Sequence, residues 1–403
     1  MRKTAKFDTV LASAVIFLLI FGLIMITSIG VPKSISLSAP GVLYPNCGDP
    51  DVDCYLLFKK HLYRLIFGLG VFFIAWKFPL RFWKKLAPLI FGAAVLSLFF
   101  VMFAGQSFGT IATNWVVFFN TSFQPSEFAK LAAIIYFSYW FSKKSEDEIT
   151  DLREGFLPFC VLALLIVGPI VFQNDFGGTF VITLISATIY FIAGARIRHL
   201  GLGLLIAFLL GIIFISSVSH VRERFTAFTR IHEECVEDYC WQSRQANIAV
   251  GSGGFFGKGL TQGVQKSYWL PQASDDFIFA ASAEELGFLR IIFVVLAYFV
   301  IAIRGYSIAN KSESNFEMFM AVGITTWIVS QAFINIAVNT ALFPVTGITL
   351  PFVSYGGSSL VTSLIGVGIL LNISQHTGHY ANTSNWRRNR GARDSKSGHY
   401  RRS

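Results

Sequence analysis

The segment "VLASAVIFLLIFGLIMITSI" (Val10 to Ile29) decides the fold class of this chain. It contains no charged residue, and about 20 mostly apolar residues suffice to span the hydrocarbon core of a bilayer. The basic stretch Met1 to Lys6 precedes it, which raises the alternative of a secretory signal. Because the apolar run is longer than a signal core and no small-residue cleavage site closes it, the segment is predicted to be a retained first span.

The rest of the chain extends this interpretation. Of the 403 residues, 54% are hydrophobic and only 14% are charged, whereas soluble domains carry about 25% charge. Hydropathy and length predict about ten helical spans, near 10–29, 61–78, 86–104, 126–142, 156–173, 177–194, 200–218, 284–303, 317–337 and 358–374. The predicted fold class is therefore all-α, a polytopic integral membrane protein with one long extracytoplasmic loop.

The distribution of basic residues predicts the orientation. With a cytoplasmic N-terminus, the inner loops and tail hold Arg81, Lys84, Lys85, Lys143, Lys144, Arg153, Arg196, Arg198, Arg304, Lys311 and the arginines after Tyr380. The outer loops 105–125, 174–176 and 338–357 contain no Lys or Arg, as the positive-inside rule requires. The net charge of +10 thus reports topology, and no nucleic-acid partner is predicted.

This topology divides the chain into three parts. Residues 1–9 form a cytoplasmic N-terminus, and residues 10–375 form the transmembrane domain, with 219–283 as its long extracytoplasmic loop. Residues 376–403 are basic and poor in aliphatic side chains, so a disordered cytoplasmic tail is expected. Such a tail either contacts anionic lipid or is simply solvated.

Four of the five cysteines are predicted to lie outside, namely Cys47, Cys54, Cys235 and Cys240. An even number in an oxidising compartment favours disulfides, and the simplest of the three pairings is Cys47–Cys54 with Cys235–Cys240. A zinc site of His232, Cys235 and Cys240 is the alternative, but its spacing matches no standard zinc pattern. No metal site is predicted.

The segment "QASDDFIFAASAEELGF" (Gln272 to Phe288) places four acids where the long loop re-enters the membrane: Asp275, Asp276, Glu284 and Glu285. Helix capping by Ser274 or Asp275 explains one of them. It does not explain all four, because acids within a membrane usually face a polar cavity or a partner. A functional site is therefore expected here.

Two other polar blocks lie at helix ends. In "FQPSEFAKLAA", Pro125 and Ser126 predict a helix start, and Glu127 and Lys130 share one face of that helix. Because Lys130 lies inside an apolar run, a second carboxylate is expected near it, and Asp276 is the candidate. In "QNDFGGTF", Asp175 falls at the outer end of a span, where a helix cap is the simplest explanation.

Two glycine-rich segments remain. "NTALFPVTGITLPFVSYGGSS" (339–359) is too broken by Pro and Gly for a continuous span, and irregular backbone at membrane depth is tolerated in a cavity wall. "GSGGFFGKG" (251–259) fails the Walker pattern. It is predicted to be a loop whose amides and Lys258 can meet a phosphate-bearing lipid.

Taken together, four blocks resemble the SEDS family of shape, elongation, division and sporulation proteins, which includes FtsW, RodA and SpoVE. They are "NWVVFFNTSFQPSEFAKLA", "QNDFGGT", "QANIAVGSGGFFGKGLTQGVQKSYWLPQASDDFIFAASAEELGF" and "PVTGITLPFVSYGGSSL". The resemblance covers the chain from the first span to about Gln375. It is strongest to the FtsW subgroup.

The resemblance implies a peptidoglycan glycosyltransferase that polymerises lipid II at the outer face of the cytoplasmic (inner) membrane, in septal wall synthesis. It also implies a class B penicillin-binding transpeptidase, other divisome membrane proteins and membrane lipids as partners. The family's essential acid aligns with Asp276, which would act as general base. Glu127 and Lys130 would position it, and Lys258 would lie near the pyrophosphate.

Other residues are placed in the substrate site or cavity by the same resemblance: Trp115, Gln124, Asp175, Gln265, Glu284, Glu285, Ser354 and Gly356. The leaving pyrophosphate carries the energy, so no nucleotide cofactor is expected, and a divalent cation is left open. The chain departs from the family pattern at Asp275, where Thr is usual, and at Asn114, Asn174 and Arg290.

Three alternatives stay open at this point. An elongation-type, RodA-like polymerase would use the same chemistry. A lipid II flippase would need ionisable residues at the inner as well as the outer side, whereas Glu127, Asp175, Asp276 and Glu284 cluster towards the outer face. A non-catalytic scaffold would need neither Asp276 nor Lys130.

Overall fold

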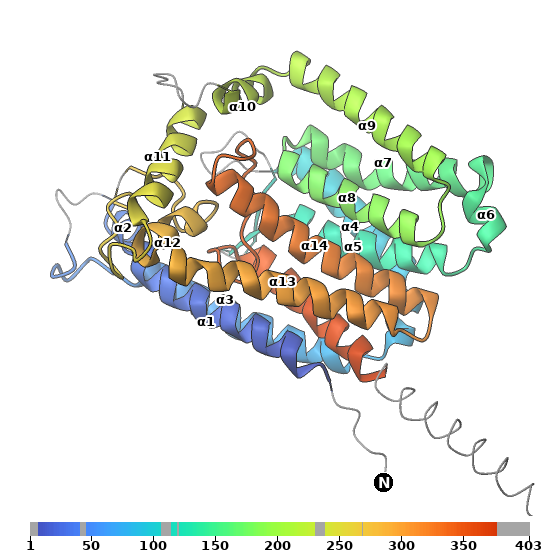
Figure 1. The fold of residues 1–403 in the computed structure, drawn as a ribbon, viewed down its shortest axis with the longest axis horizontal. Helices are drawn as coiled ribbons and strands as arrows, with labels where there is room; N and C mark the ends of the chain where they lie inside the picture. Colours follow the sequence, from blue (N-terminus) through green and yellow to red (C-terminus); the bar gives the residue numbers. More distant parts are fainter. Residues whose placement is uncertain are drawn as a thin grey trace, which may run out of the picture.

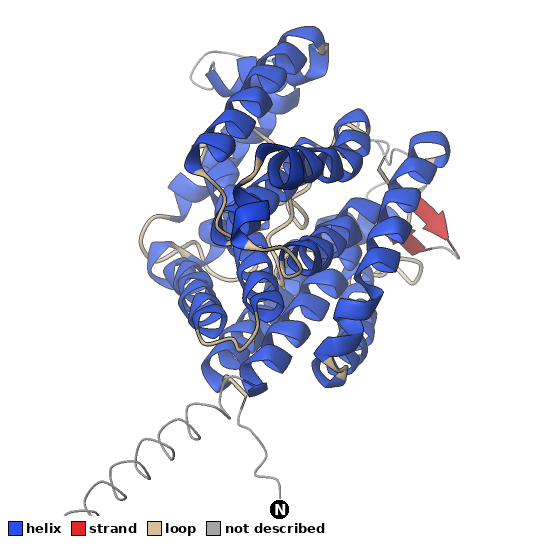
Figure 2. Cartoon of the chain, turned by 90° about the vertical axis from the view of Figure 1, so that its right-hand side faces the viewer, coloured by secondary structure: helices blue, strands red, loops and turns tan. Residues whose placement is uncertain are grey.

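The computed structural model describes residues 7–40, 46–105, 114–118, 121–229, 238–267 and 269–376. In these ranges the chain is a bundle of long helices with several shorter helices at one end (Figure 1). Strands β1 (Val116–Phe118) and β2 (Thr121–Phe123) form an antiparallel pair at the edge of the bundle (Figure 2). Apart from this pair, the described chain has the predicted all-α fold.

Every predicted span corresponds to a helix. These helices are α1 (Thr9–Ile29), α3 (Leu56–Lys77), α4 (Leu80–Ala104), α5 (Pro125–Phe141), α7 (Leu157–Phe172), α8 (Phe176–Ile192), α9 (Ile197–Ser217), α13 (Phe288–Asn310), α14 (Asn315–Asn339) and a last helix, Gly357–His376. The shorter elements are α2 (Val31–Ser38), α6 (Glu146–Thr150), the π-helical turn η1 (Leu152–Phe156), α10 (Ser219–Thr229), α11 (Asp238–Gly253) and α12 (Ile278–Leu286).

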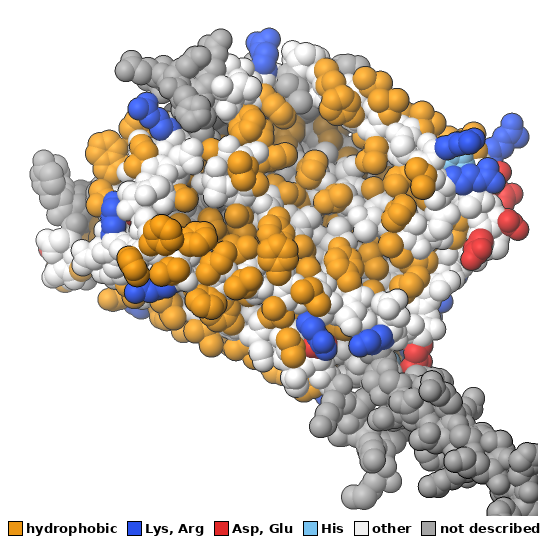
Figure 3. Space-filling view, in the orientation of Figure 1, with side chains coloured by type: hydrophobic (Ala, Val, Ile, Leu, Met, Phe, Trp, Pro, Cys, Tyr) orange, Lys and Arg blue, Asp and Glu red, His pale blue; other side chains and the backbone are white. Residues whose placement is uncertain are grey.

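The outside of the bundle is apolar. Among the described residues, six helices are long and apolar enough to cross a membrane, and α8 and α9 are shorter apolar helices. Large side chains such as Leu96 and Phe103 on α4 and Phe208 on α9 are mostly exposed. Figure 3 shows hydrophobic side chains across the face of the bundle, with charged ones towards its margins. An apolar surface of this extent fits contact with lipid rather than water.

Helix α14 forms the centre of the bundle and packs against α5, α8 and α13. At Gly323 a Cβ atom would lie 2.8 Å from Ile134 of α5 and 2.9 Å from Ile189 of α8. The absence of a side chain there therefore lets three helices approach closely. As a result, polar side chains on α14 are surrounded by protein.

Contacts between chain ends show which helix termini lie together. Asp8, the N-cap of α1, accepts a hydrogen bond from Arg304 near the end of α13, with Nε 2.9 Å from Oδ2. The Asp8 amide donates to Oγ of Ser374 in the last helix, at 3.2 Å. The start of α1 and the ends of α13 and the last helix thus share one end of the bundle, and α2, α11 and α12 lie at the opposite end (Figure 1).

Two sequence expectations at the re-entry segment are wrong. The span predicted at 284–303 begins at Phe288, because Gly287, with φ +74°, separates α12 from α13. The capping role expected of Ser274 or Asp275 is not found, since the N-cap of α12 is Phe277 and makes no side-chain capping bond. The long loop is also helical in large part, through α10, α11 and most of α12.

One of the two predicted disulfides is formed within the described residues. Cys47 and Cys54 form a disulfide with their Cα atoms 5.7 Å apart, and Cys240 is disulfide-bonded. His232 and Cys235 lie outside the described residues, as do residues 1–6 and 377–403, so the Cys235–Cys240 pair and the disordered tail stay predictions. Within the described ranges, no group of three His, Cys, Asp or Glu side chains could hold a metal ion.

Candidate functional site

Asp275 and Asp276 lie on a turn that precedes α12, outside the membrane-spanning helices. The turn closes on the Gln272 carbonyl, which accepts from the amides of Asp275 and Phe277 at 3.0 and 3.3 Å. The Asp276 carbonyl accepts from the side-chain amides of Asn335 and Asn339, at 2.8 and 2.9 Å. Two amides of the buried helix α14 therefore hold the backbone of this acid.

The broken segment 340–356 supports the same turn from another side. Oγ of Ser354 donates to the Asp275 carbonyl at 2.6 Å and accepts from the amide of Leu350 at 2.8 Å. The Tyr355 amide donates to the Ser274 carbonyl at 2.9 Å. A Cβ added to Gly347 would lie 3.7 Å from Oδ2 of Asp276. The segment that was expected to form a wall therefore lies directly beside the acid pair.

The surroundings of Asp276 favour its protonated form. Burial, followed by the neighbouring charge of Asp275, raises the pKa of the Asp276 carboxyl to about 7, against the opposing charges of Lys33 and Arg224. Burial also raises the pKa of Asp275, which the Lys33 ammonium opposes through an ion pair. A carboxyl with a pKa near neutrality can accept and release a proton at physiological pH, as a general base must.

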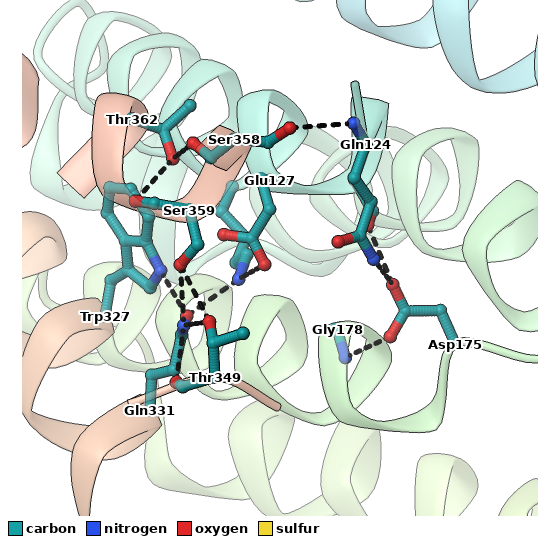
Figure 4. A network of polar contacts seen from close by, with 12 residues as sticks. Gln124, Glu127, Asp175, Gly178, Trp327, Gln331, Thr349, Ser358, Ser359 and Thr362 are labelled. Atoms are coloured by element: carbon teal, nitrogen blue, oxygen red, sulfur yellow. Dashed lines mark hydrogen bonds and ion pairs between the residues drawn. The ribbon is translucent and has the colours of Figure 1, made fainter. Parts of the chain in front are cut away.

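A second polar cluster lies inside the bundle (Figure 4). Nζ of Lys130 on α5 donates to Oε1 of Glu127 and to Oε1 of Gln331 on α14, each at 2.7 Å. Gln331 also accepts from Nε1 of Trp327 at 2.8 Å and donates to the Thr349 carbonyl at 3.1 Å. The same-face pair of Glu127 and Lys130 is thus formed, and both side chains are buried.

The ion pair expected between Lys130 and Asp276 is not formed in the described structure, where the ionic partner of Lys130 is Glu127. Glu127 lies one turn earlier on the same helix, and Gln331 supplies a second acceptor, so two of the three ammonium protons are used locally. Lys130 connects to the acid turn indirectly, because Gln331 binds Thr349 in the segment that supports Asp275.

Asp175 joins α5, α8 and the strand segment. As the N-cap of α8, it accepts from the Gly178 amide through Oδ1 at 2.7 Å. Its Oδ2 accepts from Oγ of Ser126 at 2.7 Å, from Gln124 at 3.2 Å and from Asn114 at 3.3 Å (Figure 4). Trp115, directly after Asn114, is half-buried. Asp175 and Gln124 therefore organise this junction together.

The two glutamates of the acid-rich segment bind the loop that precedes the turn. Glu284 accepts from Nζ of Lys258 at 2.6 Å and from the amides of Val264 and Gln265 at 3.1 and 3.0 Å. Its side chain is fully buried, and Lys258 remains one-third exposed. Lys258 and Gln265, which were expected near the substrate, are brought together with Glu284 rather than with Asp276.

Glu285 repeats this arrangement with different partners. It accepts from Nζ of Lys266 at 2.6 Å, from Oγ of Ser28 on α1 at 2.7 Å and from the Thr261 amide at 3.1 Å. Its side chain is fully buried as well. The pair of glutamates therefore fastens the loop 257–267 to α12 and to the end of α1.

Sequence reasoning missed several residues at the site. Gln331, Asn335 and Asn339 recur every four residues in "QAFINIAVN", which places three amides on one face of α14. That spacing within an apolar helix was a usable signal. Lys33 carried no such signal, because nothing near it in sequence indicates its partner.

These features define a class of protein: a multi-pass membrane protein with a carboxylic acid at one end of its helical bundle whose pKa is raised to about 7. Residues 9–379 of the chain match the family model of FtsW, RodA and SpoVE, which is described as "Cell cycle protein". The protein therefore belongs to the FtsW/RodA/SpoVE family.

Similar proteins include two named "Probable peptidoglycan glycosyltransferase FtsW". The one from Trichlorobacter lovleyi is 34% identical over 92% of this chain and 94% of its own, and the one from Bacillus subtilis is 33% identical over 93% and 92%. A chain from a structure of a peptidoglycan synthase complex that coordinates polymerization and crosslinking has a TM-score of 0.71 at 24% identity, covering 91% of this chain and 97% of its own. The Thermus thermophilus rod shape determining protein RodA has a TM-score of 0.64 at 24% identity, covering 91% and 96%. These structures share the fold.

Proposed function

We propose that this protein is a peptidoglycan glycosyltransferase that polymerises lipid II into glycan strands for septal wall synthesis, with Asp276 as general base. Relatives about one-third identical over nearly the whole chain carry the name of this activity. The observation that carries the residue assignment is the position of Asp276. It lies on a turn held by α14 and by segment 340–356, with its pKa raised to about 7.

The chemistry needs little more than a well-placed base. A sugar hydroxyl attacks the anomeric carbon of a second glycan, a new C–O bond forms, and the bond to the lipid-linked pyrophosphate breaks. Asp276 takes the hydroxyl proton as the attack proceeds, and the pyrophosphate leaves with the electron pair of the broken bond. Since the leaving group carries the energy, no nucleotide takes part.

The proposed orientation follows from the two ends of the bundle. The end with Asp8, Arg304 and Ser374 would be cytoplasmic, and the end with α2, α11, α12 and Asp276 would face outside the inner membrane. Residues 10–375 would form the membrane domain. A lipid-linked substrate could then reach Asp276 from the outer leaflet. A class B penicillin-binding transpeptidase, other divisome membrane proteins and membrane lipids are the proposed partners.

A flippase is the less favoured function, because the acids of the candidate site lie together at one end of the described bundle and the relatives are named for glycosyl transfer. An elongation role would change the partner and not the chemistry. The names of the relatives favour the division subgroup.

Polymerisation of labelled lipid II by the purified protein with its transpeptidase tests the proposal. Asp276→Asn should abolish glycan strands, while Asp275→Asn should retain them, with both variants shown to be folded by thermal unfolding in detergent. Normal strands from the Asp276→Asn protein would refute the base assignment. Absence of strands from the wild-type complex would refute the activity.

A further inference from the structure

A cation from another part of the chain pairs with the acid turn. Lys33, on the short outer helix α2, forms an ion pair with Asp275 and donates to Oε1 of Gln272 at 3.2 Å. These two residues are the beginning and the middle of the turn that carries Asp276. One ammonium group thus spans the turn from the α2 side.

Helix α2 is itself fixed to the bundle. Oγ of Ser34 accepts from the Leu57 amide of α3 at 3.1 Å, and Oγ of Ser38 accepts from the Asp53 amide at 3.0 Å. The Cys47–Cys54 disulfide closes the connection between α2 and α3. Lys33 therefore projects from an anchored element, which is what a side chain needs in order to hold another segment in place.

The charges around the turn explain why a cation is needed. Asp275 and Asp276 are neighbours, and two carboxylates in a half-buried place repel each other. The other charged groups that act on one or both of them are Arg64 of α3, Arg224 of α10 and Asp175, the N-cap of α8. The Asp275 side chain is 15% exposed and that of Lys33 37% exposed, so their pair is shielded from water more than an ordinary surface pair.

We propose that Lys33 is a positioning residue for Asp276. Lys33 binds Asp275 and Gln272, which holds the acid turn in place and offsets the charge of Asp275. This inference rests on the proposed function, in which Asp276 is the base. The role belongs to α2, an element outside the blocks that carry the family resemblance.

A series of variants that remove one or both charges, followed by two readouts, tests the proposal. The first readout is the pH dependence of lipid II polymerisation. Lys33→Met removes a cation near Asp276 and should therefore raise the pKa of that carboxyl. The acidic limb, which is the fall of the polymerisation rate at low pH, should then move to higher pH by about half a unit or more. Asp275→Asn removes an anion and should move it to lower pH. The double variant Lys33→Met/Asp275→Asn restores the local charge balance and should return the limb towards that of wild type.

The second readout is hydrogen exchange of the amides of Asp275 and Phe277, which both donate to the Gln272 carbonyl. A partly exposed ion pair contributes up to about 1 kcal/mol, so these amides should exchange up to about fivefold faster in Lys33→Met. Lys33→Arg keeps the charge and should resemble wild type. Lys59→Met is the matched control, because Lys59 pairs with Asp53 at 2.9 Å in the neighbouring, more exposed segment.

The outcomes separate the two proposals. If Lys33→Met matches Lys59→Met in both the pH limb and the exchange rates, Lys33 does not position the turn. If activity falls equally at every pH and exchange is unchanged, the positioning role is likewise rejected. If the wild-type complex makes no glycan, the proposed function fails, and the exchange comparison still decides whether Lys33 holds the turn.

Discussion

At the residue scale, four acids that are close in sequence have three different surroundings. Asp276 has a backbone held by Asn335 and Asn339. Asp275 is paired with Lys33. Glu284 and Glu285 are buried with one lysine each. The four carboxylates therefore divide into a candidate base, its charged neighbour and two loop anchors.

The raised pKa of Asp276 predicts an unusual pH dependence. A base works only when deprotonated, so polymerisation should fall as the pH drops below about 7. An unperturbed Asp would stay active down to about pH 4. The initial rate of glycan formation between pH 5 and 9, at saturating lipid II, measures the acidic limb. A limb near pH 4 would contradict the assignment, provided that the protein stays folded across the range.

At the element scale, the two buried glutamates hold a loop on a helix. Each carboxylate binds one lysine and at least one loop amide, so α12 and residues 257–267 form one unit. The unit also includes the end of α1 through Ser28. Because the carboxylates are fully buried, their neutralisation leaves a lysine without its counter-charge.

Glu285→Gln should therefore weaken this unit strongly, because the lysine that it leaves unpaired, Lys266, is only 7% exposed. Removal of one partner of a buried ion pair typically costs about 3–5 kcal/mol. We expect a lower midpoint of thermal unfolding in detergent and faster proteolysis within 254–267. Glu146→Gln, at an exposed acid of α6, is the matched control and should change neither. Equal stability of the two variants would argue against the anchoring role.

The junction between α12 and α13 depends on a glycine. Gly287 has φ +74°, and a Cβ there would lie 2.2 Å from the backbone nitrogen of Gly257. Backbone cannot move aside cheaply, and the conformation of Gly287, with φ +74° and ψ 174°, costs other residues about 1–3 kcal/mol. Gly287→Ala should therefore lower the yield of folded protein and its unfolding midpoint.

Gly70→Ala is the control for that substitution. Gly70 lies inside α3 with open space around its Cβ position, so alanine there should be neutral or stabilise the helix by up to about 1 kcal/mol. Fluorescence-detected size-exclusion chromatography after a temperature series compares the two variants. A Gly287→Ala protein as stable as Gly70→Ala would show that the junction can relax.

At the scale of the whole molecule, the helix order predicts the side of each connection. Four spans precede Lys144 and seven precede Thr229, so these points lie on opposite sides of the membrane if the N-terminus is cytoplasmic. Alkaline phosphatase fused after Thr229 should be active, and the same enzyme fused after Lys144 should be inactive. The reverse pattern would invert the proposed orientation and put Asp276 on the cytoplasmic side.

The sequence by itself determined the presence of the spans, the starts of α5 and α8 and the segments that contain the site. Hydropathy, proline and capping residues act over a few neighbouring positions, so α5 begins at Pro125 and Asp175 caps α8 as expected. The boundary at Gly287 was missed because the apolar run continues across it. Only the close approach of Gly257, 30 residues earlier by number, explains the break.

Only the tertiary structure decided which charge binds which. Lys33 and Asp275 are separated by 242 positions, and Lys130 and Gln331 by 201, so no local pattern could pair them. Lys130 pairs with Glu127, as their spacing predicted, but the second carboxylate expected beside it, Asp276, is not its ionic partner in the described structure. The physical reason is that a buried ammonium takes the acceptors that helix packing brings within about 3 Å, and that packing is set by the whole bundle.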